Sequence, residues 1–425
     1  MSVPLWSVIL ASLATAVIFG LLLVIFARSE KEITQRVGHL YAISDPQFLR
    51  SMGVLLGPAL VTGNRVETLL NGNQIFPAML NAIRSAEKTI TFETYIYWSG
   101  NIGKTFVDTL SEKARQGVKI HVLLDWVGSQ KMEESSIQKM RDAGVEVEKY
   151  HPLKWYTWRR LNNRTHRKIL VVDGKVGFTG GVGIADEWNG DAQGPNNWRD
   201  THYRIEGPVV AQLQAAFIDN WTKLTGKVLH SGEYFPELKE DGPYFAQVFK
   251  SSREGGAESM HLMYLLSIAS AKKSIHLSMA YFVPDELARE AMVAALKRGV
   301  KIQIILPGRY IDKTLVRSAS RGTWGSLLAA GAEIFEFQPT MFHCKVLVVD
   351  GLWVSIGSTN FDNRSFKLND EANLNVYDPQ FAERQIADFQ ADMARARQIT
   401  LQEWKNRSWK EKAREYVLES IQSQL

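Results

Sequence analysis

The stretch HRKILVVDGKVGFTGG, residues 166–181, decides the fold, because it returns later in the chain as HCKVLVVDGLWVSIGS, residues 343–358. Both copies read His-x-Lys, then four residues, Asp, six residues, Gly, and Gly or Ser. The run of Ile, Val and Leu after each lysine is typical of a strand buried in a core. Residues two apart in a strand share a face, so each histidine and its lysine are predicted to point the same way.

Other segments repeat in the same order around these two copies. GVKIHVLLDW from residue 117 matches GVKIQIILPG from residue 299, and AGVEVEKY from residue 143 matches AGAEIFEF from residue 330. Helical patterns lie between the apolar runs, and strand–helix alternation indicates an α/β fold. We therefore predict two similar domains, each a mostly parallel β-sheet flanked by helices.

The predicted boundaries follow the repeat. The first domain covers residues 40–230 and the second covers 244–425, which ends in a basic helix. Residues 231–243 carry turn signals at Pro236 and at Gly242-Pro243, and are the expected linker.

An apolar segment precedes the repeats. No charged residue occurs from Val3 to Ala27, and such a run is long enough to cross a bilayer as a helix. We expect residues 1–30 to form a single transmembrane anchor; a cleaved signal peptide and a buried core helix are the alternatives. Arg28, Lys31 and Arg36 follow the run, which favours a cytoplasmic location for the domains on the inner membrane of a bacterium.

Composition narrows the function classes. The 425 residues are 45% hydrophobic and 22% charged, as in folded proteins, and the net charge is +5. This small positive excess favours partners that carry phosphate, without separating a nucleic acid from an anionic membrane. Cys344 is the single cysteine, which excludes an intrachain disulfide and argues against a Cys-rich metal site.

Two histidines and two lysines suit the cleavage of a phosphodiester. One histidine can attack phosphorus to form a covalent intermediate, and the other can transfer protons to and from the alcohols. Lys168 and Lys345 would supply the positive charge, so we expect no metal ion and no cofactor. Gly180 and Gly181 are predicted to open a helix whose free N–H groups bind phosphate oxygens.

These motifs resemble those of the phospholipase D superfamily, over nearly everything after residue 45. The stretch GSTNFDNRSFKLNDEANL, residues 357–374, is similar to bacterial cardiolipin synthases, with further likeness in TGGVGIADEW from residue 179 and NNWRDTHYRIEGP from residue 196. The resemblance implies metal-independent chemistry at one site shared by the two domains.

The resemblance also implies roles for single residues. His166 would be the nucleophile and His343 the general acid and base, and the catalytic set would include Lys168, Lys345, Asp173 and Asp350. Ser358 and Asn360, with the lysines, would hold the phosphate, and Asp200 and Glu371 would orient the histidines. The first copy departs from the family pattern, because Gly183 stands where the second copy has Asn360.

Four functions fit this reading. The first is a cardiolipin synthase-type transferase that moves a phosphatidyl group from one phosphatidylglycerol to another at a membrane surface. The others are a phospholipase D hydrolase, an endonuclease of the same superfamily, and a scaffold with a decayed site. The apolar N-terminus and the small net charge argue against nucleic acid as a partner, and the complete motifs argue against the scaffold. The oligomeric state cannot be read from the sequence.

Two segments combine aromatic and basic residues. Residues 153–164, an insertion relative to the second repeat, suit a lipid headgroup layer, stacking on single-stranded nucleic acid, or a solvated loop. The stretch from Trp404 to Tyr416 either lies on a lipid surface or packs against the body.

Overall fold

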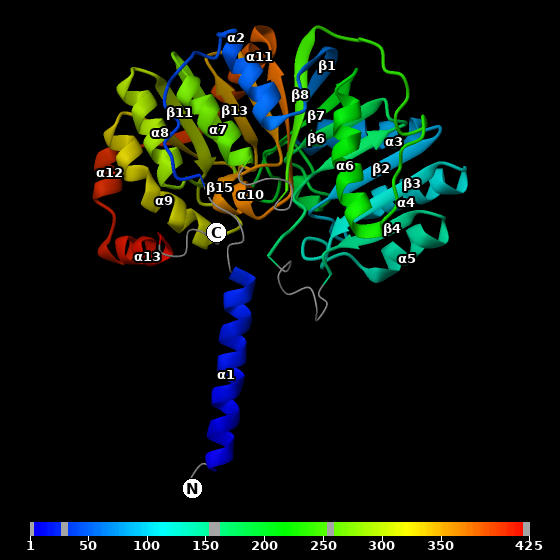
Figure 1. Cartoon of the computed structure of the whole chain (residues 1–425), viewed down its shortest axis with the longest axis horizontal. Coiled ribbons are helices and arrows are strands. Elements are labelled where there is room, and N and C mark those ends of the chain that lie inside the picture. The colour runs from blue at the N-terminus through cyan, green and yellow to red at the C-terminus, as the bar shows by residue number, and fades with distance from the viewer. Residues whose placement is uncertain (1–3, 27–32, 153–161, 253–258, 420–425) are drawn as a thin grey trace.

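The computed structural model describes residues 4–26, 33–152, 162–252 and 259–419, and shows two similar halves side by side above one projecting helix (Figure 1). The strands of the first half are β1 (Val61–Leu70), β2 (Thr89–Thr94), β3 (Lys119–Asp125), β4 (Glu146–Tyr150), β5 (Ile169–Val172), β6 (Val176–Gly180) and β7 (Thr201–Glu206). Those of the second half are β8 (Tyr244–Ser251), β9 (Ser274–Met279), β11 (Lys301–Pro307), β12 (Glu333–Phe337), β13 (Lys345–Val349), β14 (Trp353–Gly357), β16 (Glu371–Tyr377) and β17 (Ala396–Ile399), with a separate short pair β10 (Phe282–Val283) and β15 (Phe361–Asp362).

Helices cover both faces of the strands. The first half carries α3 (Asn71–Ser85), α4 (Asn101–Arg115), α5 (Glu134–Asp142), a 3-10 turn at Asp186–Trp188, and α6 (Val210–Thr225). The second half carries α7 (Ser259–Ser270), α8 (Glu286–Lys297), α9 (Thr314–Ala329), α10 (Asn363–Lys367), α11 (Pro379–Met393), α12 (Leu401–Lys405) and α13 (Trp409–Glu419). Helix α2 (Pro46–Ser51) and a π-helical turn, Met52–Leu56, pack on the second half.

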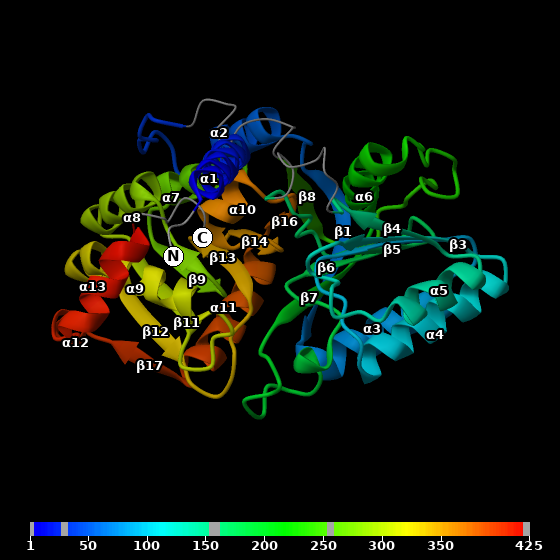
Figure 2. The ribbon, with the colours of Figure 1, turned by 90° about the horizontal axis from the view of Figure 1, so that it is seen from below.

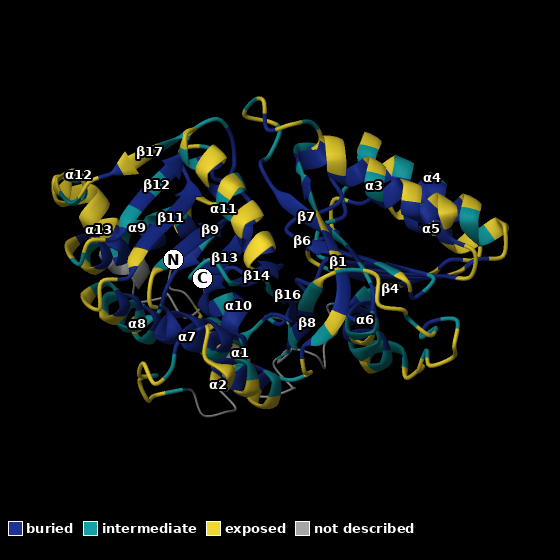
Figure 3. Cartoon of the chain, turned by 90° about the horizontal axis from the view of Figure 1, so that it is seen from above, coloured by how far each residue is buried: buried dark blue, intermediate teal, exposed yellow. Residues whose placement is uncertain are grey.

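One sheet runs through both halves. Within the described ranges its order is β17-β12-β11-β9-β13-β14-β16-β8-β1-β7-β6-β5-β2-β3-β4, and the halves meet where β1 pairs antiparallel with β8. A shared apolar core contains residues of α6, of α11 and of strands from both halves, among them Phe217, Phe381, Val171 and Val348. Figure 3 shows the central strands largely buried, with exposed residues on the outer faces of the helices and on the edge strand β17. The division into two separate domains with a linker stays a prediction.

The α/β fold class is confirmed, but the prediction of mostly parallel sheets is wrong. In the large sheet the described parallel ladders are β2-β3-β4 in the first half and β9-β11-β12 in the second, and the separate short pair β10-β15 is parallel as well. The described ladders between the other neighbours are antiparallel. The physical reason lies in the motif itself, whose Asp-Gly pair turns the chain straight back.

Each motif forms a hairpin around that Asp-Gly pair. Asp173 and Gly174 have φ of 53° and 64°, and Asp350 and Gly351 have φ of 55° and 63°. Two consecutive positive φ angles make a type I′ turn, which suits the twist of antiparallel strands. The Asp173 carboxylate accepts the backbone N–H groups of Glu87, Lys88 and Thr89 at 2.7–2.9 Å.

The second aspartate makes the same contacts. The Asp350 carboxylate accepts from the N–H groups of Lys272, Lys273 and Ser274 at 2.7–3.0 Å. Both aspartates thus tie a hairpin turn to the start of the neighbouring strand, β2 or β9. We therefore propose a structural role for them, in place of the catalytic role expected from the sequence.

Helix α1 (Leu5–Phe26) stands clear of the body in Figure 1, and Figure 2 views it nearly end-on from below. Its segment Leu5–Leu22 has a mean hydropathy of 2.3, and none of it is buried against the rest of the protein. This removes the buried core helix from the alternatives. Ile33, Val37 and Tyr41 pack on the core of the second half, so α1 is joined to that half.

The C-terminal segment packs against the body. The Trp404 indole donates a hydrogen bond to the Arg321 carbonyl at 2.7 Å, and Arg407 pairs with Glu415 at 2.7 Å. Helix α13 lies on α9, while Trp409 remains 74% exposed. Residues 153–161 of the aromatic and basic insertion lie outside the described residues.

We predict that Asp173→Ala lowers the free energy of unfolding by about 1–3 kcal/mol, because three N–H donors lose their acceptor. The activity of each folded molecule should persist. Thermal unfolding and rates normalised to folded protein measure both effects. Asp173→Asn is the matched control, since asparagine tolerates positive φ and keeps one acceptor oxygen. Lost activity in a fully folded Ala variant would contradict the structural role.

Candidate active site

One pocket of about 580 Å³ opens where the two halves meet. His166, Lys168, His343 and Asn360 line it, so both motifs contribute to a single cavity. The further lining residues are Tyr95, Ile96, Val127, Arg164, Trp198, Tyr281, Asp312, Lys313, Thr314, Leu315, Val316, Asp362, Arg364, Ser365 and Asn369. His166 is 7% and His343 5% exposed, so both rings are nearly closed off from bulk water.

His166 is held by the second half. Its backbone N–H donates to the Asp370 carbonyl at 2.9 Å, and its ring Nδ1 lies 3.0 Å from each carboxylate oxygen of Glu371. A carboxylate beside Nδ1 favours the proton on that nitrogen, which leaves the Nε2 lone pair free. The Glu371 carboxylate also accepts the Ser358 hydroxyl at 2.6 Å.

His343 is held by the first half in the same way. Its backbone N–H donates to the Arg199 carbonyl at 2.7 Å, and its ring Nδ1 lies 2.8 Å from Asp200. Asp200 accepts the Trp188 indole N–H at 2.9 Å as well. Each histidine is therefore anchored, through backbone and ring, by two consecutive residues of the opposite half. The sequence predicted these carboxylates but not this crossed pairing.

The two lysines occupy equivalent places beside the histidines. Lys168 Nζ donates to the His166 carbonyl, and Lys345 Nζ to the His343 carbonyl, both at 2.8 Å. Lys345 Nζ also lies 3.2–3.3 Å from the two ring nitrogens of His343. Both ammonium groups are buried, 3% and 2% exposed, so their charge acts on the pocket with little screening.

Burial favours the neutral form of both histidines. Desolvation, with Lys168 and Lys345 adding to it, holds the pKa of His166 well below its usual range. Desolvation and Lys345 lower the pKa of His343 to about 4, although Asp200 opposes them. The neutral ring of His166 suits a nucleophile, and an anionic substrate would favour protonation of His343.

The two carboxylates differ. Burial raises the pKa of Glu371 to about 7, against the opposing effect of Lys168 and Ser358. Burial also opposes ionisation of Asp200, but His343, Lys345 and the Trp188 N–H outweigh it and lower the pKa of that carboxyl. Asp200 therefore stays anionic, which is the form that supports a protonated His343.

The glycine pair does not open a helix. Gly180 ends strand β6, and the Gly181 N–H donates to the Thr201 carbonyl at 3.1 Å, so it is not free for phosphate. A Cβ at Gly181 would lie 2.2 Å from Asp200 Oδ1. Gly180 and Gly181 therefore allow β7 to bring Asp200 close, and the Gly181 N–H is not available for the predicted phosphate contact.

Ser358 and Asn360 were both expected to hold the phosphate, but only Asn360 lines the pocket. The Ser358 hydroxyl donates its hydrogen bond to Glu371, and Ser358 does not line the pocket. We therefore propose that Ser358 positions this carboxylate instead of holding phosphate. Asn360 lines the pocket, and its buried side-chain oxygen has no hydrogen-bond partner. An amide oxygen only accepts hydrogen bonds, so a phosphate contact would have to come from the Asn360 amide N–H groups, and this role stays a prediction.

Gly183, the departure from the family pattern, has a steric cause. A Cβ at this position would lie 2.8 Å from the Ile96 Cβ. Ile96 thus occupies the space that a side chain at position 183, the equivalent of Asn360, would need. The pocket surface at Ile96 is therefore apolar, whereas the second half contributes Asn360 to the lining.

Sequence reasoning missed several residues of the pocket. Tyr281, Asp312, Lys313 and Arg364 line it, and none belongs to the repeated motif. Asp312 and Lys313 follow β11, a strand of the parallel segment, and ligands commonly bind at the carboxyl ends of such strands. Arg364 lies within the stretch from Gly357 to Leu374, and the likeness of that stretch to cardiolipin synthases was a signal that could have indicated this residue.

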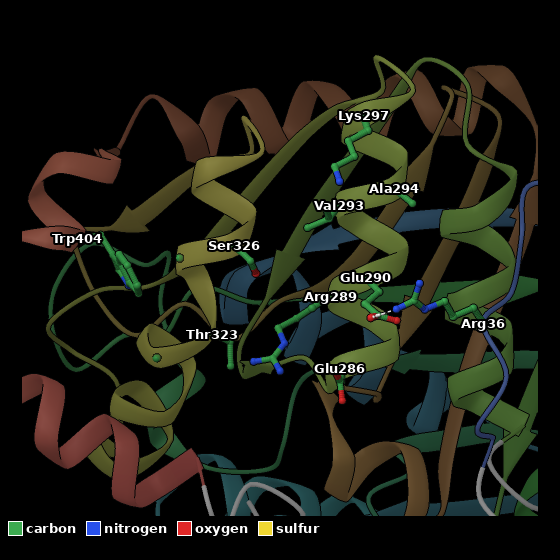
Figure 4. Close-up of a pocket in the computed structure, with 12 residues that line it drawn as sticks. Arg36, Glu286, Arg289, Glu290, Val293, Ala294, Lys297, Thr323, Ser326 and Trp404 are labelled. Carbon is green, nitrogen blue, oxygen red and sulfur yellow. Dashed lines mark hydrogen bonds and ion pairs between the residues drawn. The ribbon is translucent and has the colours of Figure 1, made fainter.

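A second hollow, of about 660 Å³, lies on the outer surface between α8, α9 and Trp404 (Figure 4). Arg36 and Glu290 form an ion pair along it, which ties the segment after α1 to α8. None of its lining residues belongs to the two motifs.

Comparisons with known proteins agree with this geometry. A family described as "Cardiolipin synthase, PLD-like domain" matches residues 79–221 and 264–393. A probable cardiolipin synthase of Bacillus subtilis is 36% identical over 341 residues, 80% of this chain and 68% of that protein. Cardiolipin synthase A of Pseudomonas fluorescens is 35% identical over 379 residues, 88% and 77% of the two chains.

Among solved structures, the phosphatidylserine synthase of Haemophilus influenzae matches with a TM-score of 0.70 at 13% identity. The match covers 89% of this chain and 100% of that one. It shows that the two share a fold.

We predict that kcat/KM falls as the pH rises through about 7. Burial lowers the pKa of Lys168 to about 7, so Lys168 loses the positive charge needed to bind the phosphate above that pH. Lys168→Arg should move this alkaline limb upward by at least one pH unit, because arginine stays protonated. A limb unmoved in an active Arg variant would show that another group titrates.

Proposed function

This chain belongs to the cardiolipin synthase family of phospholipase D-like proteins, and from that premise we propose that it joins two phosphatidylglycerol molecules into cardiolipin and glycerol. The observation that carries the proposal is the single pocket in which His166 and His343 are each fixed by a carboxylate of the opposite half. A phosphorus bound between the rings has a nucleophile on one side and a proton donor on the other.

The first step transfers the phosphatidyl group to the protein. His166 Nε2 attacks phosphorus, the bond from phosphorus to the headgroup glycerol oxygen breaks, and His343 gives that oxygen a proton. Lys168 and Lys345 stabilise the charge on the phosphoryl oxygens. A phosphohistidine and free glycerol result.

The second step is the reverse, with a different alcohol. A hydroxyl of the second phosphatidylglycerol loses its proton to His343 as its oxygen attacks phosphorus. The nitrogen–phosphorus bond then breaks and restores His166. Water in place of the lipid would give phosphatidic acid, the outcome of a phospholipase D hydrolase.

The surroundings of the pocket support a lipid substrate. Val127 and Leu315 are 39% and 53% exposed and line the same cavity as the histidines, so apolar side chains face solvent beside the site. Exposed apolar surface of this kind fits acyl chains better than nucleic acid, which is recognised mainly through its backbone charge.

The protein would work at the inner membrane of a bacterium. The apolar helix α1 supports a membrane anchor, and Arg28, Lys31 and Arg36 after it support a cytoplasmic body. Protease added outside spheroplasts should leave the body intact, and its digestion would contradict the orientation.

The purified full chain, incubated with phosphatidylglycerol vesicles and a chelator, should form cardiolipin and glycerol, detected by mass spectrometry. His166→Ala should lower the rate by at least 10³-fold and leave no covalent adduct, because the nucleophile is gone. His343→Ala should slow both steps and let the adduct accumulate. Phosphatidic acid alone would indicate hydrolysis, and cleavage of added DNA without lipid turnover would end the lipid proposal.

A further inference from the structure

The two walls of the pocket offer different chemistry to a substrate. On the first wall Ile96 fills the space beside Gly183, and Val127 adds further apolar surface. In the repeat, Ile96 corresponds to Tyr281, so the second wall has a phenol where the first has an aliphatic group. Tyr95 and Arg164 also line the first half of the pocket, where the Tyr95 ring lies 5.1 Å from that of His166. On the second wall, the side of His343, the polar lining includes Tyr281, Asp312 and Lys313.

Tyr281 and Asp312 form a pair on that wall. The Tyr281 hydroxyl lies 2.7 Å and 2.8 Å from the two carboxylate oxygens of Asp312, and both residues line the pocket. The Tyr281 ring stands perpendicular to that of His343, with 6.3 Å between the centroids. The pair is therefore next to the histidine that exchanges protons with the alcohols.

The pair presents acceptors to the pocket. Burial and the Asp312 charge hold the pKa of Tyr281 well above its usual range, so the phenol keeps its proton and donates it to the carboxylate. The lone pairs of the phenol oxygen and the remaining ones of Asp312 can then only accept. A matching ligand group must be a hydrogen-bond donor, which means a hydroxyl or an ammonium.

The charge of the pocket favours the hydroxyl. Lys313 lines the same cavity, with its Nζ 5.8 Å from the centroid of the Tyr281 ring. Lys168, Arg164 and Arg364 add further positive charge to the lining. An ammonium entering this space would meet like charges, whereas a neutral hydroxyl would not.

We propose that Tyr281 and Asp312 form the subsite for the reacting alcohol and bind the hydroxyl that neighbours the attacking one, so that the site selects vicinal diols such as a terminal glycerol. This rests on the proposed function, in which the leaving and the entering alcohol both lie on the His343 side of phosphorus. The hydroxyl on the adjacent carbon donates to the pair while the terminal oxygen attacks and passes its proton to His343. The subsite thereby distinguishes a glycerol headgroup from water and from simple alcohols.

A competition between acceptors isolates the subsite from the first step. The full chain receives phosphatidyl-p-nitrophenol, whose leaving group needs no acid, in the presence of equal concentrations of two alcohols. Both alcohols partition one common phosphohistidine, so the product ratio depends only on the second step. Mass spectrometry of the lipid products gives the ratio, and p-nitrophenol release gives the rate of the first step.

The native chain should favour 1,2-propanediol over 1-propanol by about tenfold, the effect of one hydrogen bond to a charged group. It should not favour ethanolamine over 1-propanol. In Tyr281→Phe and in Asp312→Asn the preference for the diol should fall to about twofold or less, and this ratio stays interpretable even if p-nitrophenol release slows, because both alcohols partition the same intermediate. Tyr310→Phe is the matched control, a tyrosine two residues before Asp312 that does not line the pocket, and it should keep the native ratio.

Each other outcome overturns the proposal. A native chain without preference for the diol, or variants that keep it, would mean that the pair only holds the segment before α9 in place. A strong preference for ethanolamine would show that the subsite binds an ammonium group instead of a hydroxyl. If the native chain releases no p-nitrophenol, the proposed function itself fails, and the subsite with it.

Discussion

The whole site depends on two buried histidine–carboxylate pairs that cross between the halves, His166 with Glu371 and His343 with Asp200. Each acid keeps a donor in its own half, Ser358 or the Trp188 indole, but its histidine comes from the other half, so a half standing alone would lose the ring that pairs with its buried acid. The crossed backbone bonds from His166 and His343 to the residues just before those acids fix the rings further. The single sheet through β1 and β8 and the shared core are therefore the conditions for the chemistry, because they hold the two motifs in register.

The same burial prepares the site for a phosphodiester. Desolvation lowers the pKa of both lysines and both histidines. Keeping these side chains protonated in the buried pocket therefore costs free energy. A bound phosphodiester supplies the missing negative charge and lowers that cost. The two walls offer different contacts, since the first is apolar around Ile96 and the second carries the polar side chains of Asn360, Tyr281 and Asp312.

The repeat and its motifs predicted the α/β fold, the pairing of each histidine with its lysine on one side of the chain, and the set of orienting acids. The antiparallel hairpins were missed because the Asp-Gly turn signal at Asp173 and Asp350 was interpreted as chemistry. Which acid serves which histidine depends on contacts between residues 143 and 205 positions apart, and no local pattern encodes these. The role of Gly181 likewise depends on the distant side chain of Asp200, and that of Gly183 on Ile96.

The most direct test of the shared site is a crystal structure of the full chain with vanadate, which imitates phosphorus during in-line displacement. A single vanadium should lie between the rings, bonded to Nε2 of His166, with Nε2 of His343 facing the oxygen on the opposite side. Lys168 and Asn360 should contact the remaining oxygens. Separate ions at each histidine, or a vanadium near only one of them, would contradict the claim that His166 and His343 act on one phosphorus from opposite sides.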